Sequence, residues 1–596
     1  MLLVERCTGT PHLLKKLGNM TRIRKVEINN FRGIQHLDWN PSEGINCLIG
    51  PGDSGKSTIL DAIDICLGAR RNVVFYDTDF HNLDVGQPLI ISITLGDLPD
   101  ALKNIESYGI FLRGYDNLTD TLEDEPEAFM ETVLTLRLTV SDDLEPSWTL
   151  FSERALTEGF ERNLAWKDRL AIAPARIGHY TNSHLSWARG SILNRLTEER
   201  ANLGAELADA ARQARLRFGT QAATQLAATL KIATDTANDL GVSVGKSVQA
   251  LLDAHAVTLG SGAIALHSEE GVPLQSLGTG STRLLVAGLQ RVAAEVASIV
   301  LVDEVEHGLE PHRLTSLLTS LGAKEAKPPS QVFMTTHSPV AVRELTGDQL
   351  VIVRKQQDGH KALGVGTTDE IQSTVRADPE AFLAKSVIVC EGASEVGLAR
   401  GLDQYWEAQG GPSFFALGGS YVNVGGRTAD LVYQRGTALC RLGYRVLVLA
   451  DSDKTPTAKV VERFRHCGGE AITWQEGHTL EDELFLSLSE SAVEKLLSYA
   501  VELLGEELVD NHIKAKSNGA LNLEKIWLDF IVDGCSVETR GILAKAAKSN
   551  KTENCWFKSV TKYQHIAKNI VGPDKDTAEP SFKKLVSQIR DWMHVA

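Results

Sequence analysis

The sequence predicts an α/β protein with several domains, because short apolar strands recur along its 596 residues between stretches of helical character. In the first part of the chain, one such strand leads into a glycine-rich loop and another ends in two acids. Beyond residue 385, two more strands end in carboxylates. The length is several times that of a usual domain, so we expect about two to four domains, each with its own core.

The first motif is a glycine-rich loop between a strand and a helix. Residues 45–49 (INCLI) read as a short buried strand and lead into GPGDSGKS at 50–57, which an apolar helix follows to about residue 67. In this pattern backbone N–H groups surround a phosphate chain, the lysine reaches its β and γ oxygens, and the serine hydroxyl binds Mg²⁺. The sequence therefore predicts an ATP site, with Ser57 also a Mg²⁺ ligand, made by Gly50, Gly52, Asp53, Ser54, Gly55, Lys56, Ser57 and Thr58.

The middle of the chain predicts a helical insertion. Residues 191–258 are rich in alanine, leucine and charge, with Leu193, Leu203 and Leu207 near helical spacing. We expect this insertion to serve packing or dimerisation. Only about 220 residues separate Lys56 from Ser276, too few for the long coiled-coil arms of chromosome-tethering ATPases.

A second strand supplies acids of the kind that complete a nucleotide site. Residues 298–302 are continuously apolar and are followed by Asp303 and Glu304. In phosphoryl-transfer sites the first of two such acids holds Mg²⁺, and the next orients or polarises the attacking water. We assign these roles to Asp303 and Glu304. The alternative is a buried strand that simply ends in two solvated acids.

Three further segments indicate the class of ATPase. QSLGTGST at 275–282 precedes an apolar helix and resembles the ABC signature, in which Ser276, Gly278 and Gly280 would cover a nucleotide held by a second subunit. GLEP at 308–311 resembles a D-loop, and the strand at 331–335 is followed by His337, which resembles the switch histidine. The order of these motifs predicts an ABC-type ATPase head, and such heads work in pairs.

Two strands beyond residue 385 deliver carboxylates to a sheet edge. They are VIVCEGASE at 387–395 and VLVLADSD at 446–453. Open α/β folds bind ligands at the C-terminal ends of parallel strands. Asp451 and Asp453 are two residues apart, so they share one face of an extended strand end and could hold a hard cation. This pair of motifs resembles the Toprim domain of topoisomerases, primases and certain nucleases.

In the Toprim interpretation more acids join this site. Glu391 acts as metal ligand or general base, Glu395 can face it from the next helix, and HTLEDE at 478–483 offers another carboxylate for a second ion. Two Mg²⁺ ions roughly 3.5–4 Å apart would stabilise the attacking and leaving oxygens of a phosphodiester, with Mn²⁺ or Ca²⁺ as alternatives. The predicted metal ligands here are Glu391, Glu395, Asp451, Asp453, Glu481 and Glu483.

An ABC-type head that opens with IRKVEINNFRG at 23–33 and continues into a Toprim domain resembles the OLD (overcoming lysogenization defect) nucleases. This family includes the nuclease subunit of the Gabija anti-phage system. The resemblance covers roughly residues 20–570. It implies an ATP-regulated, metal-dependent DNA endonuclease or nickase in anti-phage defence, acting as a dimer or tetramer, and leaves a helicase partner open. It also implies a lysine beside the scissile phosphate, for which Lys558 is our candidate, with Lys551 and Lys562 close behind.

The predicted fold is thus an ABC-type ATPase head with a mixed sheet and a helical insertion, then a Toprim α/β domain and a helical C-terminal region. The expected boundaries are 1–19 for an N-terminal extension, 20–190 and 259–380 for the two parts of the ATPase, 191–258 for the insertion, 385–485 for Toprim and 486–596 for the C-terminal helices.

Charge and hydropathy limit the partners and the location. The net charge of −16 argues against a wholly basic nucleic-acid coat. From Arg540 onward, however, 11 Lys and Arg residues face 5 Asp and Glu residues. This excess predicts either a DNA-contacting surface or a solvated helical face. No apolar stretch has the length of a membrane span and no secretory signal is evident, so we expect a cytoplasmic protein without membrane contact.

Two other functions stay open on the sequence alone. One is a DNA repair or recombination ATPase resembling the RecF group, whose Toprim domain binds DNA without cleaving it. The other is a nucleotide-sensing regulator that acts through a partner.

Overall fold

The computed structural model describes residues 21–70, 73–178, 184–186, 191–193, 204–239, 245–250, 264–292, 298–356, 358–532, 534–548 and 555–595. The predicted N-terminal extension and parts of the predicted insertion lie outside these residues. Two compact units make up the chain: residues 1–31, 40–45 and 60–334 form the first, and residues 32–39, 46–59 and 335–596 the second. The domain boundaries given above stay predictions.

The first sheet has seven strands, in the order β2-β1-β4-β7-β5-β6 with β8 on β7. The pairs β1·β4, β4·β7, β5·β6, β5·β7 and β7·β8 are antiparallel. Alternating apolar residues let these strands bury one face, as in β1, where Ile23, Val26 and Ile28 are fully buried. The strands are β1 (Arg22–Phe31), β2 (Ile34–Trp39), β4 (Leu89–Gly96), β5 (Leu112–Asp116), β6 (Thr121–Glu123), β7 (Glu131–Val140) and β8 (Pro146–Phe151).

The second sheet is mixed and has the order β13-β12-β3-β11-β10-β9. Strands β9, β10 and β11 are parallel to one another and β12 is parallel to β3, whereas β13 returns antiparallel to β12. Buried apolar runs form its centre, as a sheet covered on both faces requires. The strands are β3 (Ile45–Ile49), β9 (Ala175–Ile177), β10 (Ile299–Val302), β11 (Gln331–Thr335), β12 (Leu350–Gln356) and β13 (Gly359–Gly364).

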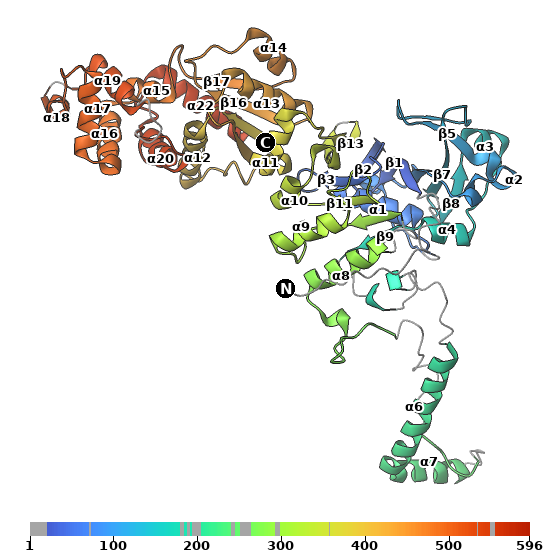
Figure 1. The fold of residues 1–596 in the computed structure, drawn as a ribbon. Helices are drawn as coiled ribbons and strands as arrows, with labels where there is room; N and C mark the ends of the chain where they lie inside the picture. The colour runs from blue at the N-terminus through green and yellow to red at the C-terminus, as the bar shows by residue number, and fades with distance from the viewer. Residues whose placement is uncertain are drawn as a thin grey trace, which may run out of the picture. The chain divides into compact units, whose positions relative to one another are not determined.

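The helices that precede the third sheet include two successive helices, α6 and α7 (Figure 1). Most of the described side chains of this pair are exposed. The helices are α1 (Lys56–Leu67), α2 (Ile105–Tyr108), α3 (Glu153–Glu158), α4 (Trp166–Ile172), α6 (Gly204–Gln225), α7 (Ala227–Asp239), α8 (Thr279–Val292), α9 (Pro311–Ser320), α10 (Pro339–Glu344) and α11 (Asp369–Ala377).

The third sheet is parallel throughout, with the order β15-β14-β16-β17. Its strands are β14 (Ser386–Cys390), β15 (Gly419–Asn423), β16 (Arg445–Ala450) and β17 (Glu470–Thr473). Helices α12 (Ala393–Ala408), α13 (Ala429–Arg441) and α14 (Ala458–His466) connect them. The central strands SVIVC and RVLVLA are almost wholly buried, because helices cover the sheet.

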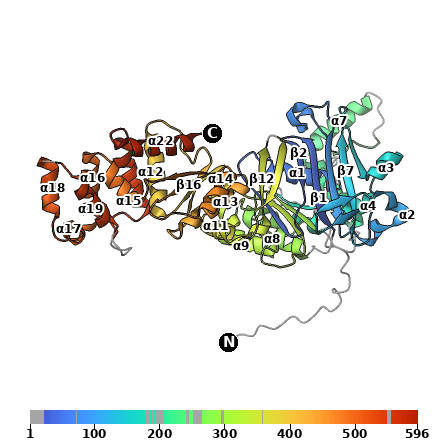
Figure 2. The same ribbon diagram turned by 90° about the horizontal axis from the view of Figure 1, so that it is seen from above.

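Helices make up most of the described residues after β17, as predicted for the C-terminal region, and gather beside α12 (Figure 2). They share one apolar core with the third sheet, which includes Trp556, Phe557 and Phe582. These helices are α15 (Leu480–Ser487), α16 (Glu490–Leu504), α17 (Glu506–Lys516), α18 (Leu523–Val532), α19 (Val537–Ala547), α20 (Val560–Ile566), α21 (Gly572–Asp574) and α22 (Pro580–His594). Of the helices described, none combines the length and apolar character that crossing a bilayer requires.

Candidate functional site

Two acids follow neighbouring strands of the third sheet. Glu391 comes directly after β14 and Asp451 directly after β16, and the two strands run parallel side by side. The backbone N–H of Asp451 donates a hydrogen bond to Glu391 Oε2 at 3.1 Å. The fold therefore joins at one sheet edge two acids that lie 60 residues apart in the sequence.

Two helices bring further acids to this edge. Glu395 lies in the first turn of α12 and is 3% exposed, and its Oε2 accepts a hydrogen bond from the Gly392 N–H at 2.8 Å. Asp451 Oδ1 accepts one from the Leu480 N–H at 3.0 Å, which anchors the first turn of α15 and with it Glu481. We call Glu391, Glu395, Asp451 and Glu481 the acidic cluster.

Helix α20 closes one side of the acidic cluster. Two glycines of α12 permit its close approach: a Cβ at Gly397 would lie 2.5 Å from the Val560 carbonyl oxygen, and one at Gly401 2.4 Å from that of Gln564. The approach brings Tyr563, which is fully buried, to the cluster, where its hydroxyl donates to Glu481 Oε1 at 2.7 Å. Sequence reasoning missed Tyr563, and the only local signal was the spacing of the two glycines.

The acidic cluster combines two buried acids, Glu391 and Glu395, with the half-buried Asp451 and Glu481, and these carboxylates repel one another. Burial, reinforced by Glu395, Glu391 and Glu481, raises the pKa of Asp451 far above its ordinary value. Burial, followed by Glu481, likewise raises the pKa of Glu395, and burial raises that of Glu391. Within the described part of the chain, none of the four acids forms an ion pair with a lysine, arginine or histidine. A bound cation would relieve this excess of negative charge.

The two other predicted metal ligands in this region, Glu483 and Asp453, are not members of the acidic cluster. Glu483 is fully buried, and its oxygens contact His478 Nδ1 at 2.8 Å, the Ser487 hydroxyl at 3.3 Å and the Gln475 N–H at 3.3 Å. Asp453 is exposed in the loop after β16. Of the acids in 478–483, the structure therefore brings Glu481, and not Glu483, to the acidic cluster.

The donor atoms of the acidic cluster suit a hard cation, because all of them are carboxylate oxygens. Among the residues with described positions, however, no three His, Cys, Asp or Glu side chains surround a common metal position. Charge and donor chemistry therefore fit Mg²⁺ or Mn²⁺, and completing the ligand shell requires rotation of these side chains.

The candidate lysine lies on the segment that leads into α20. Lys558 is exposed, and both Lys558 and Glu481 act on the thiol of Cys555. Burial raises the pKa of Cys555, Lys558 lowers it and Glu481 raises it, so the lysine and the acid lie within electrostatic range of one side chain. Lys562 Nζ donates to the Trp556 carbonyl at 3.1 Å. Lys551 is outside the described residues.

The glycine-rich loop has the backbone that its sequence predicts. Gly50 and Gly55 have φ of 133° and 87°, and a Cβ at Gly50 would lie 2.7 Å from the Val353 carbonyl oxygen. Lys56 begins α1, and its Nζ donates to the carbonyl oxygens of Gly50 at 3.1 Å and Pro51 at 2.7 Å, so the ammonium is held within the loop. The exposed members of this loop are Gly52, Asp53 and Ser57, whereas Ser54 is buried and Gly55 and Thr58 are partly exposed.

The acids after β10 are tied to the predicted signature segment. Arg283 of α8 is 1% exposed and donates to the carbonyl oxygens of Asp303 at 2.7 Å, Glu304 at 2.9 Å and His307 at 2.8 Å. Glu304 has φ of 46°, a conformation that costs energy for a residue with a side chain. Sequence reasoning missed Arg283, because nothing local to it signals these contacts.

The signature glycines also fit the loop that follows the acids. A Cβ at Gly280 would lie 2.5 Å from the Gly308 carbonyl oxygen, so only glycine allows this approach. Ser276 and Gly278 are exposed just before α8. Arg176 Nη2 lies 3.9 Å from Asp303 Oδ2 and 2.7 Å from Asp61 Oδ1, another contact that the sequence did not indicate. His337 is exposed after β11.

Comparison with known proteins gives partial matches. The OLD nuclease of Thermus scotoductus is 24% identical over 360 residues, which cover 56% of this chain and 62% of that protein. The DNA replication and repair protein RecF of Chlorobium limicola is 36% identical over 58 residues, 10% of this chain and 16% of that protein. The chain thus spans less than two thirds of the length of these relatives. The SMC head domain from Thermotoga maritima aligns over 58% of this chain and 100% of its own at 13% identity, but a TM-score of 0.28 supports no statement about the fold.

One family model matches residues 45–343, from β3 through the signature segment and the acids after β10 to α10. Its description is "AAA domain, putative AbiEii toxin, Type IV TA system". Because the match extends over half of the sequence, the chain belongs to this family of AAA ATPase domains.

Proposed function

We propose that the chain is a nucleotide-regulated, divalent-metal-dependent DNA endonuclease or nickase of the OLD type. The observation that carries the proposal is the acidic cluster, which gathers two buried and two half-buried carboxylates at the C-terminal edge of a parallel sheet, where none of them forms an ion pair with a described residue. The partial likeness to an OLD nuclease supports it. We further propose that residues 385–485 form a Toprim domain and that the activity serves anti-phage defence.

In this proposal the side chains around the acidic cluster have distinct tasks. Glu391, Glu395, Asp451 and Glu481 hold divalent ions, which when bound supply a nucleophilic water and stabilise the charge on the attacked phosphodiester. Glu391 is either one of these metal ligands or the general base. Tyr563 holds Glu481 in place through its hydroxyl, and Lys558 offsets negative charge on the DNA. Asp453, exposed beside the cluster, is available to the solvent-facing side of an ion.

The ATPase part is proposed to regulate cleavage. Lys56 and Ser57 contact the nucleotide phosphates and Mg²⁺, and Asp303 holds the same ion. Glu304 orients the attacking water, and His337 acts as the switch histidine of this site. Ser276, Gly278 and Gly280 cover the nucleotide of a second copy, so the working form is at least a dimer. Nucleotide occupancy then alters the equilibrium between two arrangements of the dimer.

The test is cleavage of supercoiled plasmid by the purified chain with Mg²⁺ or Mn²⁺. We expect Glu391→Gln and Asp451→Asn to lower the rate more than about 100-fold, because even outer-shell changes at metal sites cost about 10–100-fold. Glu407→Gln, an exposed acid of the same helix as Glu395, is the matched control and should cleave normally. Undiminished cleavage by the Glu391 and Asp451 variants would refute the nuclease assignment.

The match to RecF favours a second candidate, an ATPase for DNA repair whose third sheet binds DNA without cutting it. It predicts that Lys56→Ala abolishes function in cells whereas Glu391→Gln does not. A nuclease predicts loss with both variants, so a survival or repair assay with the two variants side by side separates the candidates.

A further inference from the structure

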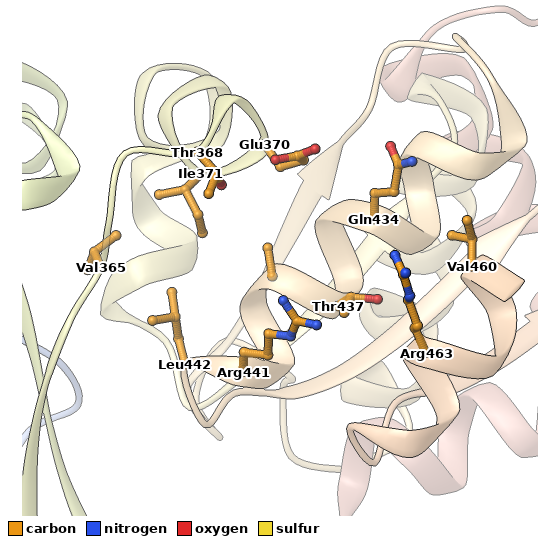
Figure 3. A pocket seen from close by; sticks show the side chains of 11 residues that line it. Val365, Thr368, Glu370, Ile371, Gln434, Thr437, Arg441, Leu442, Val460 and Arg463 are labelled. Atoms are coloured by element: carbon orange, nitrogen blue, oxygen red, sulfur yellow. The ribbon is translucent and has the colours of Figure 1, made fainter.

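A cavity of about 340 Å³ is lined by none of the residues of the acidic cluster. Helices α11, α13 and α14 form its walls (Figure 3). Its size falls at the lower end of the range of small-molecule sites, about 300–1,000 Å³, and exceeds what a single water or ion needs.

Two arginines of this cavity have no partner. Arg441 at the end of α13 and Arg463 in α14 both line it, and in Figure 3 their guanidinium groups lie on either side of Thr437. Among the described residues neither guanidinium makes an ion pair or hydrogen bond. Both side chains are exposed to solvent, and an anion between them would accept several charge-assisted N–H bonds.

The rest of the lining limits the kind of anion. The cavity also has an apolar wall, made by Val365, Ile371, Leu442 and Val460. A free inorganic ion would gain no favourable contact with this wall. Glu370 on α11 lies opposite and can accept hydrogen bonds from a hydroxyl or amino group. Two arginines and one glutamate leave a net charge of +1, which suits one phosphate group better than a triphosphate.

We propose that this cavity binds a small organic phosphate monoester of the nucleoside monophosphate type. Arg441 and Arg463 hold the phosphate, the apolar wall contacts the base or sugar, and Glu370 accepts from its polar groups. The site is separate from the phosphate loop and from the acidic cluster.

The cavity adjoins a link between two sheets. The carbonyl of Leu442, a wall residue, accepts a hydrogen bond from Arg354 Nε of β12 at 3.1 Å, and the Arg354 guanidinium lies 4.0 Å from the centre of the Tyr444 ring. The Tyr444 hydroxyl donates to the Phe382 carbonyl at 2.7 Å. A ligand in the cavity therefore contacts the segment that connects α13 to β16, the strand that Asp451 directly follows.

The experiment is calorimetric titration of the full chain carrying Lys56→Ala, which disables the phosphate loop. The probes are AMP, GMP, CMP, UMP, inorganic phosphate and a short single-stranded DNA. We expect at least one mononucleotide to bind, and Arg441→Gln or Arg463→Gln to weaken it at least 10-fold. Arg465→Gln, an exposed arginine of the same helix that does not line the cavity, should bind as the parent does.

A steric variant gives an independent check. Val460→Trp fills the cavity without changing its charge and should also abolish binding, with thermal unfolding measured to show that it folds. Absence of binding by every mononucleotide, equal binding of inorganic phosphate, or equal weakening by Arg465→Gln would overturn the proposal. The proposal would also fail if the two arginine variants lost only DNA binding, because Arg441 and Arg463 would then be contacts for the backbone of DNA.

Discussion

Two groups of acids in this protein differ in whether they form ion pairs with a cation of the chain. In the first sheet, Arg24 is 6% exposed and contacts Glu131 Oε2 at 2.7 Å, Glu43 Oε1 at 2.7 Å and Asp97 Oδ2 at 3.0 Å. At the edge of the third sheet, Glu391, Glu395, Asp451 and Glu481 gather, and none of them forms an ion pair with another described residue. The first group is complete within the protein, whereas the second lacks the positive charge that its burial demands.

The comparison teaches how to separate a structural from a functional cluster of charges. Counting acids does not distinguish them, because both groups are rich in carboxylates. The presence or absence of a neighbouring cation distinguishes them. A group of carboxylates whose negative charge no ion pair neutralises is a candidate site for an external cation.

Removing the cation from the balanced group should have the largest effect on stability. Arg24→Met leaves three acids facing one another, and we expect a loss of about 2–3 kcal/mol, below the usual cost of breaking a fully buried pair because Glu43 and Asp97 are 67% and 44% exposed. Urea unfolding of the metal-free protein measures it. A change below about 0.5 kcal/mol would show that this group is not held by Arg24.

Neutralising one acid of the unbalanced group should have the opposite sign. Asp451→Asn removes a repelled charge, so in the presence of EDTA we expect the variant to be more stable than the parent by about 1–2 kcal/mol. Adding Mg²⁺ should raise the melting temperature of the parent and leave that of the variant unchanged. Equal Mg²⁺ responses would break the comparison, since the cluster would then not be the cation site.

Asp378 is an intermediate case and should show the smallest effect. Burial raises its pKa to about 6, against the hydrogen bond from the Asn423 N–H and the charge of Arg435. Because its folded pKa lies above the ordinary value of 3.8, its stabilising contribution is present at low pH and is lost as pH rises through about 6.

Asp378→Asn should therefore gain stability relative to the parent as pH increases from about 4 to 7, a difference of roughly a degree or two in melting temperature. Thermal unfolding across this range, with Glu462→Gln as an exposed control, measures it. A difference that does not change with pH would mean that the partners of Asp378 outweigh its burial.

Much of the strand framework was predictable from the sequence, because strands buried on both faces read as continuous apolar runs. The run predicted at 298–302 is β10 (Ile299–Val302), and the runs at 387–390 and 446–450 correspond to β14 and β16. The glycine-rich loop was predictable as well, since its backbone needs the positive φ seen at Gly50 and Gly55.

The contacts that complete the candidate sites were not predictable in this way. Arg283 reaches loop carbonyls some 20 residues away, and Tyr563 reaches Glu481 across 82 residues, so neither leaves a local pattern. The choice between Glu481 and Glu483 depends on the rotation of α15, which several contacts from distant parts of the chain hold, among them the hydrogen bond from Leu480 to Asp451. Such details belong to packing and cannot be read from spacing.

The contacts of Arg283 have a mechanical consequence. One rigid, planar side chain from α8 holds three successive parts of the segment that carries Asp303 and Glu304. A rotation of α8 must therefore either shift these carbonyl groups by a similar amount or break the buried hydrogen bonds of Arg283. Helix and acids should consequently move as a single body, so that a force on the N-terminal end of α8 would reach Glu304 directly.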